Sequence, residues 1–365
     1  MSAPALKAEV LHFFDPTGFG SGSRAFYARG GWFTANDPVS LRQLFKKWKG
    51  PYHPRNGDNI ALQDARLDLG VRFGENYYAG YFSRYNAFIR TNRDFTDFYH
   101  TVKNRLPFDS TRIYRLKLEI EGIKENGVIF SSSGILFEDD DSRLEAGAAL
   151  SLSLANAMQD GTIDGAAHIE DRKTYTINAR SRYYYTHNYL YHLDTEDADG
   201  FGLGTDFALS WYLKAYRLTA KLVVNDLFSR IYWHDLPYSF VNIATKNKSY
   251  DEDGYVHYAP TINGVEKYVN FTQKIEPRYQ LVIMKNFMSG LRLSAGTGYA
   301  YKTLFPFVRV GSQFWGDHYL GVMYESRFQS FGVEYSNQNF FLGLSADALQ
   351  EVSALGLNVG FRYWF

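Results

Sequence analysis

The chain has 365 residues, with 39 basic and 39 acidic side chains that give a formal net charge of zero at neutral pH. This balance argues against a nucleic-acid partner, which needs a basic surface. The absence of cysteine excludes disulfides, thiolate metal sites and iron–sulfur clusters. Hydrophobic residues make up 45% of the chain and aromatic residues 18%, with 29 Tyr and 29 Phe. The aromatic content is the main departure from an ordinary soluble composition.

Segments of alternating apolar and polar residues recur from the N-terminal region to the last residue, separated by turn residues. No run of 18 apolar residues occurs, so the sequence predicts no transmembrane helix. The segments predict about 16 strands, within a range of 14 to 18. The clearest predicted strands are 62–73, 77–90, 111–123, 143–154, 174–186, 201–213, 216–226, 271–285, 290–302, 303–314 and 353–365. Weaker ones are 24–34, 127–137, 161–170, 239–246, 317–325, 328–336 and 338–346.

The two faces of these predicted strands differ in polarity. In 62–73, Leu67, Leu69 and Val71 alternate with Arg66 and Arg72, so one face suits lipid and the other a polar interior. A soluble β-sandwich also alternates. Here, however, charges persist on the inner face of most strands, and the outer rows end repeatedly in aromatic residues. Without a helix, a closed barrel is the remaining way to cross a bilayer.

Connections of two lengths separate the strands. Short turns are predicted at 74–76, 124–127 and 159–161. Longer loops are predicted at 35–58, 91–109, 187–200 and 228–268. The first contains a basic amphipathic stretch, 41–49, that predicts a short helix capping the rim, entering the lumen or lying on the membrane. No domain boundary or repeat is visible, so we interpret 1–365 as a single domain.

The C-terminal strand carries the most specific pattern. Phe361, Tyr363 and Phe365 alternate with Gly360 and Arg362, and the sequence ends on the phenylalanine. This strand resembles the closing strand of Gram-negative outer-membrane β-barrels, whose C-terminal aromatic residue is read by the barrel-assembly machinery. The resemblance implies an all-β, closed antiparallel transmembrane β-barrel in the outer membrane of a Gram-negative bacterium, surrounded by lipid and lipopolysaccharide. It also makes Phe361, Tyr363 and Phe365 the expected assembly signal.

The N-terminal residues Met1 to Ala5 resemble the start of a mature exported protein with an added initiator methionine. We therefore expect that a signal peptide has already been removed.

Projected inward by alternation, the strands carry more basic than acidic side chains. The predicted lumen-lining, selectivity-determining residues are Arg66, Asp68, Arg72, Arg84, Arg90, Arg115, Lys117, Glu119, Arg180, Arg182, Arg217, Lys221, Lys274, Arg278, Arg292, Arg309 and Arg362. The other inward acids are Glu121, Glu145, Asp164, Asp206, Glu276 and Glu334. A basic lumen would favour anions. Alternatively, these residues pair across neighbouring strands and only fill the barrel.

We expect a porin-like channel for passive diffusion of small polar or anionic solutes. A second hypothesis is a non-porin barrel for polysaccharide or protein export or envelope assembly, with a periplasmic partner. A third is an outer-membrane hydrolase, for which His234-Asp235 and His187 are the candidate residues. We expect no catalytic residue, metal or cofactor. The segments 194–199 and 251–253 are interpreted as solvated acidic loops, with calcium binding as the alternative.

Two dense aromatic segments, 183–191 and 232–238, predict an interfacial belt or, alternatively, sugar stacking.

Overall fold

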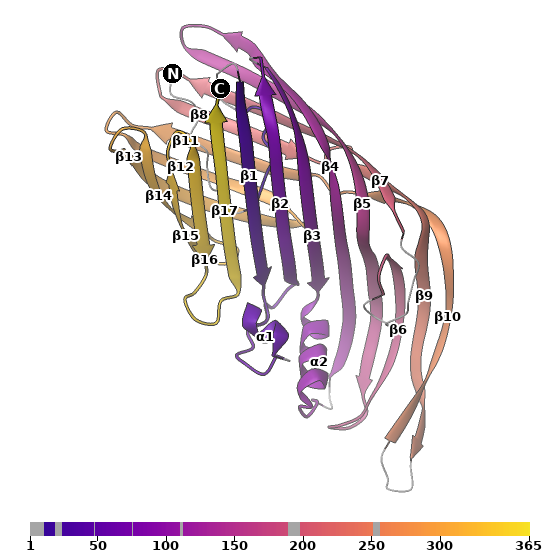
Figure 1. The fold of residues 1–365 in the computed structure, drawn as a ribbon. Helices are drawn as coiled ribbons and strands as arrows, with labels where there is room; N and C mark the ends of the chain where they lie inside the picture. Colours follow the sequence, from indigo (N-terminus) through magenta and orange to yellow (C-terminus); the bar gives the residue numbers. More distant parts are fainter. Residues whose placement is uncertain are drawn as a thin grey trace.

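A computed structural model describes residues 11–18, 24–46, 48–74, 76–109, 112–188, 198–250 and 256–365. Its strands form one 17-stranded sheet in which neighbouring strands pair antiparallel. The sheet closes on itself where β1 (Arg24–Asn36) pairs along its length with β17 (Ala354–Trp364) (Figure 1). The predicted closed antiparallel barrel, with a strand number between 14 and 18, is confirmed.

Most strands pair with their neighbours in the chain. The strands between β1 and β17 are, in chain order, β2 (Asn59–Phe73), β3 (Tyr77–Thr91), β4 (Ile113–Glu138), β5 (Ser142–Ile169), β6 (Tyr175–Tyr185), β7 (Gly200–Leu213), β8 (Leu218–Asn225), β9 (Arg230–Tyr250), β10 (Val256–Lys274), β11 (Arg278–Asn286), β12 (Leu291–Ala300), β13 (Thr303–Phe314), β14 (His318–Glu325), β15 (Ser330–Ser336) and β16 (Phe340–Ala346). Short turns such as 139–141 and 315–317 lie at the end where the chain finishes, which we call the turn end (Figure 1). The opposite end, the loop end, carries the two helices.

The wall of the barrel has unequal height. From β5 it passes to β7, then to β8, and from β8 directly to β11. Toward the loop end, β5 pairs instead with β6, which pairs with β9, which pairs with β10. The strands β4, β5, β6, β9 and β10 therefore make a tall wall, whereas β11 to β17 make a low one (Figure 1).

Three predicted connections are wrong because they lie within strands. The loop predicted at 228–268 consists largely of β9 and β10, a hairpin with little apolar alternation. The turns predicted at 124–127 and 159–161 lie inside β4 and β5, which are 26 and 28 residues long. A side chain at Gly127 would approach the carbonyl oxygen of Leu152 to 2.2 Å. This glycine thus permits close approach of two strands and does not mark a turn.

The loops 35–58 and 91–109 contain the helices. In the first, α1 (Leu41–Phe45) is shorter than the predicted stretch 41–49. In the second, α2 (Arg93–Asn104) was not predicted; its N-cap Asn92 accepts a hydrogen bond from the backbone of Phe95 at 3.1 Å. Its Phe98 packs against Tyr114 of β4. Of the predicted loop 187–200, residues 189–197 lie outside the described residues.

Among the residues that the structure describes, no helix is both long and apolar enough to cross a membrane.

The outer face of the sheet is apolar and exposed, and the inner face is buried. On β17, Phe361, Tyr363 and Phe365 are 44%, 59% and 62% exposed, whereas Asn358 and Arg362 are buried. The same alternation runs through β2, where the even-numbered residues 60–72 are buried. An exposed apolar surface that continues over many strands is the lipid-facing band of a membrane barrel.

Side chains fill much of the interior. One apolar cluster contains Phe33, Leu62, Phe88 and Phe305 from four different strands. A second contains Tyr27, Tyr78, Phe82 and Ile129. The lumen is thus a partly packed core with charged groups between the clusters.

Candidate functional site in the barrel interior

The segment 11–18, which we call the plug, lies inside the barrel. Its Leu11, Phe13 and Phe14 are almost fully buried. The backbone N–H of Phe14 donates to Asn225 Oδ1 at 3.0 Å, and the Asn225 amide donates back to the Phe14 carbonyl at 2.8 Å. Gly31 faces the plug, because a Cβ there would lie 2.7 Å from His12 Cβ. A segment so enclosed by backbone and side-chain bonds is an integral part of the interior.

Charged contacts also tie the plug to the wall. His12 Nε2 lies 2.8 Å from Asp68 Oδ2, and Arg66 Nε donates to Asp68 Oδ1 at 2.9 Å. The Arg66 guanidinium lies over the ring of Phe14, 5.2 Å from its centroid. Lys221 forms an ion pair with Asp15. The inward cations of β2 and β8 thus bind the plug directly.

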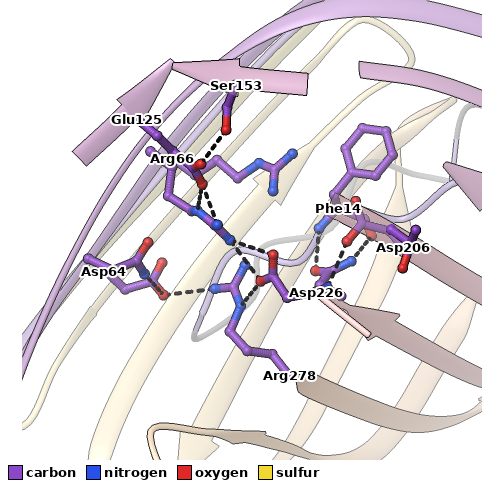
Figure 2. Close-up of polar contacts among 12 residues, drawn as sticks. Phe14, Asp64, Arg66, Glu125, Ser153, Asp206, Asp226 and Arg278 are labelled. Carbon is purple, nitrogen blue, oxygen red and sulfur yellow. Dashed lines mark hydrogen bonds and ion pairs between the residues drawn. The ribbon is translucent and has the colours of Figure 1, made fainter. Parts of the chain in front are cut away.

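A buried ion-pair network crosses the lumen beside the plug (Figure 2). Arg84 Nε donates to Glu125 Oε1 at 2.7 Å, and Arg84 Nη1 donates to both oxygens of Asp226 at 2.9 and 2.7 Å. Glu125 also accepts from Ser153 Oγ at 2.6 Å. The backbone N–H of Asp226 donates to Asp206 at 3.0 Å. These residues come from β3, β4, β5, β7 and the end of β8, so the network links distant parts of the wall.

Arg278 extends the network to β2. Its Nη1 donates to Asp64 Oδ2 at 3.0 Å, and its Nε lies 3.3 Å from Asp226 Oδ2. Asp64 accepts further hydrogen bonds from Asn86 at 3.0 Å and from the Tyr301 hydroxyl at 2.6 Å. Asp64, Glu125 and Asp226 therefore each face a guanidinium, as buried charges require.

The turn between β12 and β13 reaches into the interior. Its two residues, Tyr301 and Lys302, both have left-handed backbones, with φ of 54° and 55°. Such conformations are unfavourable for residues other than glycine and are found where surrounding contacts compensate. Lys302 forms an ion pair with Glu119, and its Nζ lies 3.4 Å from Glu121 and from Glu276. The low wall is thus linked by this turn to the tall wall.

Two cavities meet at Lys302. The outer cavity, of about 820 Å³, is lined by Arg55, Asp58, Arg90, Lys302 and Arg327 among others. The inner cavity, of about 590 Å³, is lined by residues of β3, β4, β5, β10, β11 and β12, and by residues of three connections, namely Asp226, 275–277 and the Tyr301-Lys302 turn. The sizes match those of small-molecule sites, about 300–1,000 Å³.

The predicted lining residues fall into four groups. Buried inside the barrel are Arg66, Asp68, Arg72, Arg84, Arg278, Arg309 and Arg362. Partly buried are Arg90, Glu119, Lys221 and Arg292. Exposed on the strands are Arg115, Lys117, Arg180, Arg182 and Lys274, of which Lys274 lines the inner cavity. The placement of Arg217 in a strand is wrong: it lies exposed in the 214–217 turn, with φ of 50°.

The sequence analysis missed several interior groups, among them His12, Asp64, Glu125 and Asp226. Asp64 shares the parity of Arg66 on β2, so extending the alternation by one step would have found it. Glu125 was assigned to a turn. His12 and Asp226 lie outside regular alternation, and no local signal marks them. Because these acids pair with the buried arginines, the interior is less basic than the alternation pattern implied.

A closed sheet with an apolar outer face and a charged interior defines a transmembrane β-barrel. No protein-family model matches the chain, and no curated protein sequence matches it. Solved structures similar to it include the toluene transporter TodX of P. putida, at 11% identity and a TM-score of 0.46 over 97% of this chain and 93% of that one.

The translocator domain of the autotransporter NalP from Neisseria meningitidis is also similar, at 8% identity and a TM-score of 0.33, covering 95% of this chain and 90% of that one. The outer membrane protease OmpT from Escherichia coli matches at 9% identity and a TM-score of 0.25, covering 94% of this chain and 96% of that one. Likenesses this distant carry no argument about the activity of this chain.

Proposed function

We propose that the protein is a plugged outer-membrane channel for small polar solutes. The observation that carries this proposal is the pair of cavities, both lined in part by charged side chains, that meet at Lys302 inside a lipid-facing barrel. Charged walls around a cavity provide the polar environment that a hydrophilic solute needs in order to cross a bilayer. A barrel with a purely structural role would have no need for cavities of this size.

Passage through this channel requires movement of the plug or of the Tyr301-Lys302 turn. The plug is held by Asn225, Asp68 and Lys221. Four of the buried arginines, Arg66, Arg84, Arg278 and Arg309, are already paired with carboxylates, so they are not available as a free basic lining. We therefore propose that the channel admits small polar solutes in general, without a strong preference for anions.

The proposed location is the outer membrane of a Gram-negative bacterium, with lipopolysaccharide around the loop end. In such barrels the short turns are periplasmic and the longer loops extracellular, which would place the turn end and the C-terminus in the periplasm. The exposed Phe361, Tyr363 and Phe365 then remain available to the barrel-assembly machinery. A periplasmic partner would meet the turn end.

We propose no enzymatic role. The hydrolase candidates His234 and Asp235 are exposed on β9 and do not line either cavity. The acidic segments 194–199 and 251–253 fall largely outside the described residues, so calcium binding there stays a hypothesis.

Single-channel recording in a planar bilayer tests the channel. The full chain should show rare, small openings, and a variant lacking residues 1–18 should show larger and longer ones, because removal of the plug opens the lumen. The outward-facing Leu281→Ala variant, whose side chain is 47% exposed on β11, is the control and should behave like the full chain. A plug-deleted barrel that inserts yet stays silent would contradict the proposal.

A further inference from the structure

We propose that a basic and apolar surface at the loop end binds the phosphate-bearing headgroups of lipopolysaccharide. This surface, which we call the rim patch, consists of segment 46–49 and of the side of α2, with the residues that follow it, that carries Tyr99, Val102, Lys103 and Leu106. The inference rests on the proposed outer-membrane location, with the loop end outside, and names the residues that meet the surrounding lipid. The position, the exposed apolar side chains and the charge of the rim patch carry it.

Helix α2 lies on the outside of the barrel wall. Its Phe98 packs against Tyr114 of β4, with ring centroids 5.7 Å apart. Tyr114 shares its strand face with Val128 and Phe130, which are 43% and 57% exposed on the apolar outer surface. Both helices lie just beyond the ends of β1, β2 and β3 (Figure 1). With the loop end outward, α2 therefore faces the headgroup layer that borders the lipid-facing band.

Contacts between segment 46–49 and α2 join them into one surface. The rings of Trp48 and Tyr99 meet edge to face, with centroids 5.0 Å apart. The side-chain amide of Asn104 donates to the carbonyl oxygen of Trp48 at 3.3 Å. Lys103 Nζ lies 5.5 Å from the centroid of the Tyr99 ring. Aromatic and basic side chains thus lie side by side, as they do where a protein meets a membrane interface.

The outward side of α2 is apolar although it faces away from the barrel. Tyr99 and Val102 are one helical turn apart and are 37% and 38% exposed, and Leu106 beyond the helix is 43% exposed. The opposite side of α2 already packs on the wall through Phe95 and Phe98. A helix on a water-exposed rim needs only one apolar side. A second one bordered by lysine is typical of a helix that lies in a membrane interface.

The rim patch is basic because most of its cations have no acidic partner. Segments 40–57 and 92–109 contain eight Lys or Arg residues and only three Asp. Asp94 and Asp97 are already paired with Arg112. The exposed cations that have no carboxylate oxygen within 4 Å in the described part of the chain are Lys46, Lys49, Lys103 and Arg105. A surface of unpaired cations complements phosphate groups, which are the charges that lipopolysaccharide presents.

Native mass spectrometry of the folded full chain in a zwitterionic detergent tests the rim patch. The probe is lipid A, the phosphate-bearing membrane anchor of lipopolysaccharide, with both phosphates present. We expect saturable binding of at least one molecule of lipid A. The dissociation constant should rise about tenfold or more in the double variant Lys49→Gln/Lys103→Gln, which removes two unpaired positive charges from the surface.

Lys214→Gln/Lys285→Gln is the matched control. It removes the same charge from the turn end, where Lys214 lies in the turn before β8 and Lys285 lies near the end of β11. Because that end faces away from the lipopolysaccharide leaflet, the control should bind lipid A as the wild type does.

Two results would overturn the inference. One is equal binding by Lys49→Gln/Lys103→Gln and the wild type, and the other is equal binding of lipid A without phosphates. A dimer that dissociates in the double variant would assign the rim patch to a second copy of the chain instead. Conductance of the plug-deleted barrel without lipid A binding would remove this inference alone, whereas lipid A binding by a barrel that never conducts would remove the channel alone.

Discussion

At the scale of single residues, the interior depends on arginines that bridge several carboxylates. Arg84 is 5% exposed and contacts Glu125 of the adjacent β4 and Asp226 at the end of β8. The net benefit of such a pair over apolar packing is small, but removing one partner leaves a buried charge unpaired. The cost of a substitution is therefore far larger than the value of the pair itself.

We expect Arg84→Met to lower the free energy of unfolding by about 3–5 kcal/mol, since Glu125 loses its cation and Asp226 keeps only Arg278. Reversible urea unfolding in lipid vesicles measures the change. Arg55→Met is the control, because Arg55 is exposed and should change stability little. An Arg84→Met variant as stable as the wild type would show that the network is hydrated and not buried.

Lys302 is the cation shared by both cavities and has three carboxylate neighbours, so in the proposed channel we expect it to control ion selectivity. Lys302→Met should leave the inner cavity with an excess of negative charge, so the plug-deleted barrel should shift toward cations in its reversal potential under a salt gradient. Lys214→Met, in a turn at the turn end, is the control. An unchanged reversal potential would mean that ions do not pass Lys302.

At the scale of elements, α2 is attached to the rim through hydrogen bonds between its Asp94 and the start of β4. Asp94 accepts from Arg112 and from the backbone N–H of Arg115, the latter at 3.1 Å. Burial by itself would raise the pKa of Asp94, but these hydrogen bonds outweigh it, so the pKa is lowered. A carboxyl with a lowered pKa contributes stability above its ordinary value, and that contribution is lost as the pH falls through the lowered pKa.

The attachment of α2 should therefore weaken below about pH 4, the ordinary range of an aspartate. Hydrogen exchange of the α2 amides measures this when wild type and Asp94→Asn are compared at each pH, which cancels the intrinsic pH dependence of exchange. The wild type should be better protected at pH 6, and the two should converge near pH 3. A constant difference between them would exclude ionisation of Asp94 as the cause.

At the scale of the whole molecule, closure between β1 and β17 completes the barrel. The register runs without interruption from Ala25 opposite Trp364 to Ala35 opposite Ala354. A closed sheet has no free edge and resists detergent. The outward aromatic row ending at Phe365 lies on this closing strand, where an assembly factor would meet the chain.

Phe365→Ser should reduce the fraction of chain that reaches the outer membrane in folded form, if the C-terminal aromatic residue is an assembly signal. Folded barrels migrate faster on detergent gels before boiling than after, so the fast-migrating fraction measures the effect. Phe314→Ser removes a similarly exposed phenylalanine from β13 and should have a smaller effect. Equal folded fractions for Phe365→Ser and wild type would remove the role of the C-terminus.

The sequence by itself determined the barrel class and the facing of most strands. In a bilayer every lipid-facing side chain must be apolar, so alternation in strands such as 62–73 and 353–365 is imposed locally and can be read locally. For the same reason most of the hairpin β9–β10 was predicted as a loop and only 239–246 of β9 and the end of β10 as strand, because a strand with little apolar alternation gives a weak signal. The placement of Arg66, Arg84 and Arg278 on the inner face followed from parity alone.

Only the tertiary structure decided what those inner residues contact. Arg84 and Asp226 are 142 residues apart, and Arg278 and Asp64 are 214 apart, so their pairing depends on closure of the sheet. The position of the plug depends on the space that the closed wall leaves. The charged lining of the inner cavity arises in the same way, because its side chains come from five strands and three connections that alternation treats separately.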